Sequence, residues 1–390
     1  MPVRVYSFPH LYCRTGMRAR LLLENGMGFE GCGFGAKGVK VGEVVFSTSM
    51  TGYPESLTDP SYEGQILVYT HPMVGNYGVP SKEFRVEGIP ACYESDRIHV
   101  EGFIIGELPE PSHYLSSMSL SDWLRSESVP GMYRVDTRMI VKTIRSKGVM
   151  MGVIAVYSED EEPPAWSRMM DMLRRAKRYD ELKLAYRVSP LEPIEHTPVH
   201  AGYNGRTVAV LDCGLKYGIL RELLKRGFRV VRYPCWSKAE EVIEEADAVL
   251  LSNGPGNPSI LDEAIKAVQG ILEYRLPVLA ICLGMQLLCV ASGAKTFKLP
   301  YGHRGPNKPV VDLDTGRCFV TTQNHGYAVD AGGLAGTGLR LRFLNPDDKT
   351  VEGVVDADGR VLAVQFHPEG GPGPHDSTWM FDWLARRVKA

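Results

Sequence analysis

Residues 277–288, PVLAICLGMQLL, set a cysteine and a glycine between two apolar runs. The first run has the length and composition of a buried strand, and the second has the composition of a buried helix. Cys282 therefore stands at a predicted strand-to-helix turn, and Gly284 permits the close backbone approach that such a turn needs. A tight turn of this kind can hold a side chain exposed and strained, and the positive end of the following helix favours a thiolate there.

The sequence around this turn alternates regularly between strands and helices. From residue 206 onward, short apolar runs alternate with amphipathic stretches. The expected strands are 207–213, 229–234, 247–254 and 277–282, and the expected helices are 217–227, 238–246, 259–275 and 284–293. This order predicts an α/β domain over residues 206–390, with a mostly parallel sheet and helices on both faces. Ligands of such sheets bind beyond the carboxyl ends of the strands.

Residues 17–160 have a different composition, rich in Gly, Val, Thr and Tyr. The dipeptide Asn25-Gly26 between two apolar runs predicts a β-hairpin. Further short runs of strand character are 42–49 and 64–70. One helix is expected to begin after Asp136, a suitable N-cap, and to end at Gly148. These signals predict an α+β or mainly-β N-terminal domain.

Two segments fall outside these domains. Residues 161–205 contain a proline-started helix and then a proline-rich stretch without periodicity, which predicts a helix and a linker. Residues 1–16 match nothing that follows them. We therefore expect an extension that is disordered or artefactual, with Met17 as the natural start.

The overall composition excludes several classes of protein. A length of 390 residues fits two or three domains. The net charge of −2 gives no attraction to nucleic acid or to an anionic membrane, and no apolar run approaches the roughly 20 residues of a membrane helix. The eight cysteines form no CxxC pair and no Cys/His cluster, so we expect no metal site. Reduced, mostly buried thiols in a cytoplasmic protein are the expectation.

A second candidate group ends another apolar strand. The stretch VLAVQFHPE, residues 361–369, reaches His367 at the strand end and Glu369 two residues later. A thiolate nucleophile needs a base, and a carboxylate can orient and charge-stabilise the imidazole. Cys282, His367 and Glu369 are therefore candidates for a Cys-His-carboxylate triad.

Each of these features also has an ordinary explanation. A lone cysteine in an apolar run is most often a small buried hydrophobe, as we expect of Cys213, Cys289 and Cys318. A histidine at a strand end is usually structural, and the GPG of residues 254–256 is usually a turn. From the residues alone, an acyl-transfer site is about as well supported as a set of structural residues with no catalytic role.

The ordered set of motifs resembles a known family. GPGNP, ICLGMQ and FHPE, in this order and spacing, resemble the triad-type (class I) glutamine amidotransferase domain. Residues 42–79 and 135–148 strongly resemble the N-terminal domain of the small subunit of carbamoyl-phosphate synthase, and residues 212–227 and 321–330 fit the same family. The resemblance runs over residues 17–390 and so covers both domains.

This resemblance implies a glutaminase reaction. Cys282 would attack the side-chain amide of L-glutamine, giving a γ-glutamyl thioester and ammonia, and water activated by His367 would then release glutamate. Ammonia would pass through a tunnel to a large synthetase subunit, which uses bicarbonate, ATP and Mg to make carbamoyl phosphate for pyrimidine and arginine synthesis. The chain itself would need no cofactor, and would form a heterodimer, or a higher assembly of heterodimers, with the large subunit in the cytoplasm.

Matching position by position implies a role for each site residue. Cys282 matches the nucleophile, His367 the base and Glu369 the third member of the triad. The backbone N–H groups of Leu283 and Gly254 match an oxyanion hole. The glutamine-binding set implied by the match is Ser61, Gly254, Gly256, Leu283, Gln286, Asn324, Gly326 and Tyr327. Ser61 would contribute from the N-terminal domain.

A few positions depart from the family pattern. Ala280, Met285 and Tyr327 stand where relatives usually have Gly, His and Phe, but none belongs to the triad, so we expect an active glutaminase. Lys216 lies near the predicted site edge, and a solvated lysine at a helix start explains it at least as well as a functional one.

Two other functions stay open at this point. The same chemistry could supply ammonia to an anthranilate or GMP synthase, although the N-terminal domain argues against it. The chain could also be a silent scaffold or regulatory subunit, which the intact set of Cys282, His367 and Glu369 argues against.

Overall fold

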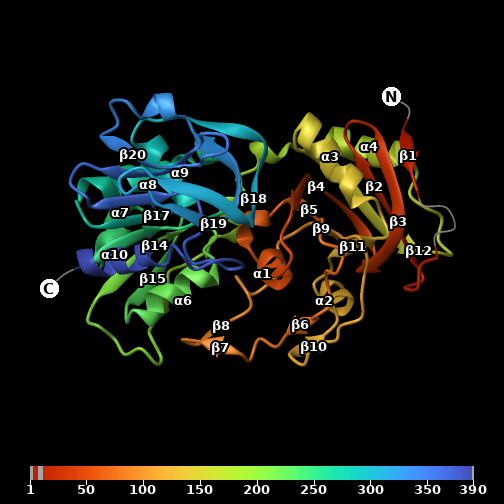
Figure 1. The fold of residues 1–390 in the computed structure, drawn as a ribbon, viewed down its shortest axis with the longest axis horizontal. Coiled ribbons are helices and arrows are strands. Elements are labelled where there is room, and N and C mark those ends of the chain that lie inside the picture. The colour runs from red at the N-terminus through yellow and green to blue at the C-terminus, as the bar shows by residue number, and fades with distance from the viewer. Residues whose placement is uncertain (1–2, 8–11, 389–390) are drawn as a thin grey trace. The chain divides into compact units, whose positions relative to one another are not determined.

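The computed structural model describes residues 3–7 and 12–388. The chain forms two compact units. Unit 1 comprises Met1–Phe84 and Asp96–Leu182, and unit 2 comprises Arg85–Ser95 and Lys183–Ala390. The short segment 85–95, which we expected within the N-terminal domain, thus belongs to the C-terminal unit. Figure 1 labels many of the elements of both units.

Unit 1 is built on one eight-stranded sheet in the order β1-β3-β11-β9-β5-β4-β12-β2. Because β2 also pairs with β3, the sheet closes on itself. Its strands are β1 (Arg4–Tyr6), β2 (Met17–Leu23), β3 (Met27–Gly35), β4 (Gly38–Ser47), β5 (Gln65–Tyr69), β9 (Gly102–Ile104), β11 (Pro130–Tyr133) and β12 (Met150–Ser158). Unit 1 also contains the α-helices α1 (Tyr53–Leu57), α2 (Leu120–Ser126), α3 (Thr137–Lys147) and α4 (Trp166–Arg175), and the short strands β6 (Val79–Pro80) and β10 (Ser116–Met118).

The local signals in unit 1 are confirmed. β2 and β3 form an antiparallel hairpin, and Gly26 in its turn has a φ of 85°, which suits glycine. The side chain of Asp136 accepts a hydrogen bond from the backbone N–H of Met139 at 2.8 Å, so it caps α3, and Gly148 follows the end of that helix.

Two expectations for the N-terminal segment are wrong. Residues 4–6 form β1, which pairs in parallel with β3, and Tyr6 stacks on Phe29 with ring centroids 5.4 Å apart. Cys13 and Cys32 form a disulfide rather than reduced thiols. Neither contact follows from spacing, because both depend on which strand the segment reaches. Residues 1–2 and 8–11 of the expected extension lie outside the described residues.

Unit 2 is built on a ten-stranded sheet in the order β13-β15-β14-β16-β17-β22-β21-β20-β18-β19. Its strands are β13 (Ile194–His196), β14 (Thr207–Asp212), β15 (Arg229–Pro234), β16 (Ala248–Leu251), β17 (Val278–Ile281), β18 (Thr296–Asp312), β19 (Cys318–Val329), β20 (Leu339–Leu344), β21 (Val351–Asp356) and β22 (Val361–Val364). Its helices are α5 (Ala185–Val188), α6 (Tyr217–Lys225), α7 (Ala239–Ile243), α8 (Asp262–Glu273), α9 (Leu283–Ala291) and α10 (Trp379–Arg387), and β7 (Arg85–Val86) pairs with β8 (Ile89–Pro90).

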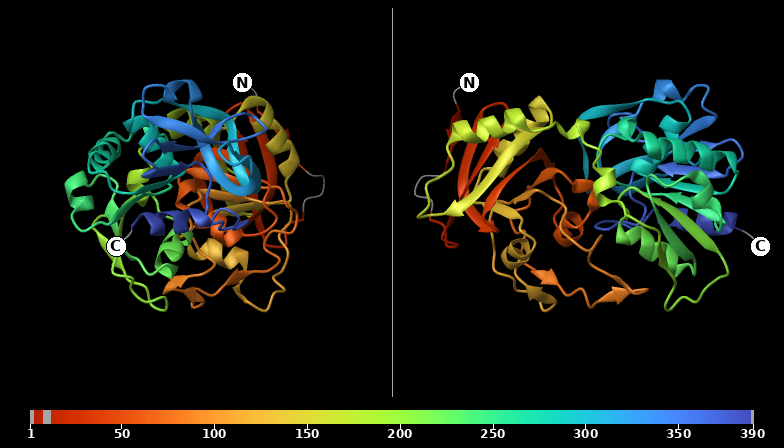
Figure 2. Two further views of the ribbon diagram at one scale, coloured as in Figure 1. Left: turned by 60° about the vertical axis from the view of Figure 1, so that its left-hand side comes forward. Right: turned by 180° about the vertical axis from the view of Figure 1, so that it is seen from behind.

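The central strands of unit 2 are parallel and buried on both faces. β15, β14, β16, β17 and β22 pair in parallel, and β18 to β21 extend the sheet antiparallel. Alternate residues enter two separate cores: Leu251 and Ala280 join the core that includes α8 and α9, whereas Leu250 and Ile281 join the one that includes α6 and α10. Figure 2 shows helices on both sides of this sheet. The predicted α/β class is confirmed.

The segment expected as a helix and linker is partly ordered into elements, since α4, α5 and β13 lie within residues 161–205. Over residues 3–7 and 12–388, no helix has both the length and the apolar character needed to span a lipid bilayer.

Candidate active site

Cys282 lies between the end of β17 and the start of α9, as predicted. Its φ of 55° and ψ of −108° are strained for a residue with a side chain. Gly284 is required beside it, because a Cβ there would lie 2.2 Å from the carbonyl oxygen of Leu251. The backbone N–H of Cys282 donates to Val364 O at 2.8 Å, which fixes the turn to β22. The turn geometry is therefore confirmed.

The expected exposure of Cys282 is wrong, since the residue is only 2% exposed. Two polar groups, one on β19 and one just after β22, contact its sulfur. Sγ lies 3.8 Å from Asn324 O of β19, and Gln365 Nε2 donates to Sγ at 3.7 Å. Sequence reasoning missed Gln365, although the two-residue period of a strand places it on the same face as His367.

His367 and Glu369 form a buried ion pair just beyond β22. Nδ1 of His367 donates to Oε1 of Glu369 at 2.7 Å, and the backbone N–H of His367 donates to Thr322 O at 2.9 Å. Burial opposes a charge on the imidazole, but the negative charge of Glu369 outweighs it and raises the pKa of His367 to about 10. The imidazole is therefore held with a proton at neutral pH.

Lys216 is the fully buried partner of Glu369. Its Nζ lies 2.8 Å from Glu369 Oε1 and donates to Gly371 O at 2.6 Å, and its side chain is 1% exposed. Burial alone would raise the pKa of Glu369, but Lys216 and then His367 outweigh this and hold it well below its ordinary value. The solvated-lysine interpretation of Lys216 is wrong. No local pattern shows this contact, because it joins residues 153 positions apart.

The two residues expected to form an oxyanion hole are neighbours in the structure. A Cβ on Gly254 would lie 2.1 Å from Cys213 O and 2.8 Å from the side chain of Leu283. Gly254 thus packs against the first residue of α9, directly after Cys282. Gly256, two residues later in the same loop, has a φ of 96°. Only glycine fits both places without strain.

Gln286 ties α9 to two strands around the cysteine. Its Nε2 donates to Tyr327 O at 2.9 Å and to Gln365 Oε1 at 3.0 Å. Asn324, Gly326 and Tyr327 lie on β19. Of these, Asn324 contacts the Cys282 sulfur and Tyr327 contacts Gln286, while the contacts of Gly256 and Gly326 with glutamine stay predictions.

Ser61 lies in unit 1, in a 3-10 turn over Pro60–Tyr62. It is buried, and its backbone N–H donates to Asp59 Oδ1 at 2.9 Å. Its expected contact with glutamine stays a prediction.

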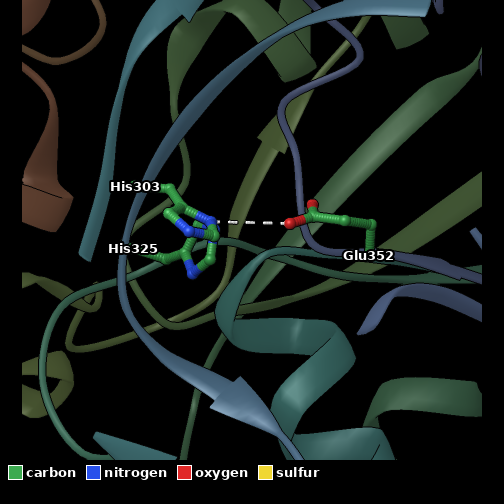
Figure 3. Close-up of side chains that lie close together, drawn as sticks. All are labelled: His303, His325 and Glu352. Carbon is green, nitrogen blue, oxygen red and sulfur yellow. Dashed lines mark ion pairs between the residues drawn. The ribbon is translucent and has the colours of Figure 1, made fainter. Parts of the chain in front are cut away.

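A second buried histidine–carboxylate group also lies in unit 2 (Figure 3). His303 of β18, His325 of β19 and Glu352 of β21 place possible metal-ligand atoms within 4.8 Å of one another. His303 Nε2 lies 2.7 Å from Asp348 Oδ2, and its Nδ1 lies 3.6 Å from Glu352 Oε1. His325 Nδ1 lies 2.8 Å from Tyr327 O. These residues could hold a cation, but each already has a partner within the protein.

The protonation of this second group follows from its partners. Burial would lower the pKa of His303, but Glu352 and Asp348 outweigh it and raise that pKa. Burial raises the pKa of Glu352, against the opposing effect of His303. Burial also holds the pKa of His325 well below its usual range. The pKa values of both His303 and Glu352 are thus raised within one buried group.

Comparison with known proteins gives matches over both units. Residues 21–154 match the family "Carbamoyl-phosphate synthase small chain, CPSase domain", and residues 209–386 match "Glutamine amidotransferase class-I". The carbamoyl phosphate synthase small chain of Sulfurisphaera tokodaii is 49% identical over 97% of this chain and 98% of its own length. Those of Sulfolobus acidocaldarius and Pyrococcus furiosus are each 49% identical, over 94% and 93% of this chain and 95% of their own lengths.

Proposed function

Because this chain belongs to the carbamoyl phosphate synthase small chain family, we propose that Cys282, His367 and Glu369 hydrolyse L-glutamine to glutamate and ammonia. The observation that carries this assignment is the buried 2.7 Å contact between His367 and Glu369 at the strand end that also hydrogen-bonds the Cys282 turn. A strained cysteine beside an oriented, protonated imidazole is the arrangement of an activated nucleophile.

The first half of the reaction forms a thioester. His367, whose pKa is raised to about 10, holds the proton that Cys282 gives up as its sulfur attacks. The sulfur attacks the side-chain amide carbon of glutamine, and the N–H groups of Leu283 and Gly254 stabilise the oxyanion. His367 gives its proton to the leaving nitrogen, so the C–N bond breaks and ammonia departs. Glu369 keeps the imidazole oriented throughout.

The second half of the reaction releases glutamate. After ammonia leaves, His367 is neutral and its Nε2 takes a proton from water. The hydroxide attacks the thioester carbon, the C–S bond breaks, and the γ-carboxylic acid formed gives its proton to solvent to become glutamate. His367 then again holds a proton, and the Cys282 sulfur is free for the next attack. Glu369 stabilises the imidazolium as it re-forms.

Glutamine would be held by its charged α-amino and α-carboxylate groups. Backbone groups of Gly256 and Gly326, with the side chains of Gln286 and Asn324, supply donors and acceptors of the type a zwitterionic amino acid needs. Tyr327 and Ser61 complete the set by family resemblance. Gln286 is supported further by its hydrogen bonds to Tyr327 and to Gln365, whose amide contacts the sulfur.

The ammonia would pass to a large synthetase subunit in the cytoplasm, in a heterodimer or a higher assembly of heterodimers. That partner would use bicarbonate, ATP and Mg to make carbamoyl phosphate. The match of residues 21–154 to the small-chain domain supports this partner over other ammonia acceptors. We also propose that this chain needs no metal or cofactor of its own, because the triad supplies nucleophile, acid and base.

The test is glutamate release from glutamine by the purified chain, with and without a large subunit, ATP and bicarbonate. Stimulation of release together with carbamoyl phosphate formation is expected. Cys282→Ser should lose about 10³-fold or more in rate. Cys289→Ser is the matched control on the same helix, because burial raises the pKa of Cys289 to about 12 and leaves it inert. Glutamate release by Cys282→Ser at the wild-type rate would overturn the assignment.

A further inference from the structure

Residues 85–95 form a strap that belongs to unit 2 although both of its ends continue into unit 1. The hairpin of β7 and β8 begins it, and Ile89 packs on the core beside α6. The carboxylate of Glu87 anchors it by accepting hydrogen bonds from the backbone N–H groups of Val199 and His200, each at 2.8 Å. The end of the strap is Glu94, which is fully buried.

Glu94 caps the first turn of α6. Its Oε2 accepts from the backbone N–H of Gly218 at 2.7 Å, and its carbonyl oxygen accepts from the N–H of Tyr217 at 2.8 Å. The N-cap residue of this helix, Lys216, offers no side-chain cap. The first N–H groups of a helix need an acceptor, and the strap provides it.

A buried arginine balances the charge of Glu94. Nη2 of Arg221 lies 2.7 Å from Glu94 Oε1, and its Nη1 donates to Tyr93 O and Pro90 O at 2.9 and 2.5 Å. The side chains of Glu94 and Arg221 are 0% and 10% exposed. Arg221 thus fastens the strap and neutralises the carboxylate that caps the helix.

The capped turn touches the loop that carries the triad carboxylate. A Cβ on Gly218 would lie 2.8 Å from Glu369 Cγ and 3.0 Å from Glu94 Oε2. A Cβ on Gly371 would lie 2.5 Å from Glu94 Oε1. Gly218 and Gly371 therefore lie between the side chains of Glu94 and Glu369. Lys216, at the start of the same helix, forms an ion pair with Glu369.

We propose that Glu94 is a positioning residue for the glutaminase reaction: it fixes the first turn of α6, and through Lys216 it orients Glu369 and hence His367. This rests on the proposed function of the triad. Arg221 contributes to the same arrangement, because its guanidinium contacts the Glu94 carboxylate and the strap carbonyls. The strap itself lies within residues 21–154, the range that matches the small-chain domain. Part of that domain's sequence therefore contacts the triad loop.

Glu94→Gln tests the proposal, with Glu87→Gln as its matched control. Each variant replaces a buried carboxylate of the strap by its amide, but of the two residues only Glu94 lies against the triad loop. For Glu94→Gln we expect kcat for glutamate release to fall by about tenfold or more, with KM within about threefold. Loss of this negative charge also disfavours the imidazolium, so the alkaline limb of the pH profile should move to lower pH. Glu87→Gln should keep kcat and that limb within about twofold of wild type.

A second readout separates this proposal from the reaction itself. The rate at which iodoacetamide alkylates Cys282, followed against pH by mass spectrometry, reports the cysteine–histidine pair without any glutamine. Its pH dependence should change in Glu94→Gln and not in Glu87→Gln. Wild-type protein that releases no glutamate would overturn the proposed function, while the alkylation comparison would still decide the role of Glu94.

Several outcomes would overturn the positioning role. One is a folded Glu94→Gln protein with wild-type kcat and an unchanged pH profile. Another is an equal loss of kcat in Glu87→Gln, which would show that any loosening of the strap suffices. If Glu94→Gln fails to fold, Glu94→Asp decides, since it keeps the charge but shortens its reach. A kcat lower by about threefold is expected for it, and a wild-type kcat would refute the proposal.

Discussion

Two buried histidine–carboxylate pairs lie in unit 2, and they differ in their surroundings. His367 and Glu369 are 2.7 Å apart at the end of β22, whereas His303 and Glu352 are 3.6 Å apart between β18 and β21. Both carboxylate side chains are 0% exposed. Yet the pKa of Glu369 is lowered and that of Glu352 is raised. The difference is Lys216, which pairs with Glu369 and has no counterpart beside Glu352 among the described residues.

The two histidines differ in the same way. Both ring nitrogens of His303 face carboxylates, Asp348 and Glu352. Nε2 of His367 has no hydrogen-bond partner among residues 3–7 and 12–388, although the Cys282 thiol is near enough to help raise its pKa. The second nitrogen of His367 therefore faces the cysteine, whereas the second nitrogen of His303 faces another carboxylate. A buried histidine beside a carboxylate becomes a candidate catalyst only when its second nitrogen is uncommitted and its carboxylate is kept ionised.

The largest effect on kcat is expected when the carboxylate of the first pair, Glu369, is replaced by its amide, and the same change at Glu352 is the comparison. Glu369→Gln should lower kcat for glutamate release by about 10³-fold, because the imidazole loses its orienting charge. Glu352→Gln should change kcat by no more than about threefold. Steady-state kinetics on both variants measures this. Equal losses would break the distinction between the two pairs.

Removing the lysine should make the first pair resemble the second. Lys216→Met leaves Glu369 buried without its main cation, so the pKa of Glu369 rises. We expect kcat to fall by about 10- to 100-fold and the acid limb of its pH profile to move to higher pH. Lys225→Met, which removes a half-exposed lysine of the same helix, is the control and should leave the profile unchanged. A wild-type profile in Lys216→Met would contradict the account.

The pairs should also differ in how stability depends on pH. The folded pKa of Glu369 is below its unfolded value near 4.5, so its contribution is present above that pH and is lost as pH falls. The folded pKa values of Glu352 and His303 are both raised, so their contribution falls as pH rises. Relative to Glu352→Gln, wild type should lose free energy of unfolding as pH rises from the acid range to neutrality. Relative to Glu369→Gln, wild type should lose stability on acidification instead.

Denaturant titrations of the three proteins at several pH values give these differences directly. Parallel pH dependences for Glu352→Gln and Glu369→Gln would show that the two carboxylates have the same ionisation in the folded state.

The smallest effect is expected for Asp348→Asn. Asp348 is 41% exposed in its side chain and pairs with His303 at 2.7 Å. A partly exposed ion pair contributes little, so the free energy of unfolding should fall by less than about 1 kcal/mol, with kcat unchanged. Thermal unfolding and steady-state kinetics on one preparation suffice. A large loss of kcat would mean that the second pair acts on the site through His325 and β19.

Local sequence patterns predicted the parts of the site that are contiguous along the chain. The strand-to-helix turn at Cys282, the glycine at 284 and the two-residue spacing of His367 and Glu369 could all be derived from periodicity and turn chemistry. The parallel sheet followed from the alternation of strands and helices. These features depend on neighbours in sequence, so the sequence carries them directly.

The contacts that tune the site could not be predicted in this way. Lys216 reaches Glu369 across 153 residues, and Glu94 reaches Gly218 across 124 residues from a segment assigned to the other domain. The burial of Cys282 depends on β19 and β22 together. Each is fixed by which elements pack against one another, and periodicity within one element does not encode that.

The most direct test of the central claim is acid quenching of the protein during turnover with glutamine labelled in its carbon chain. The account predicts that label appears on the peptide that contains Cys282, as a hydroxylamine-sensitive glutamyl thioester, and that Cys282→Ser shows none while Cys289→Ser is labelled normally. Glutamate release with no label on Cys282, or label that persists in Cys282→Ser, would contradict it.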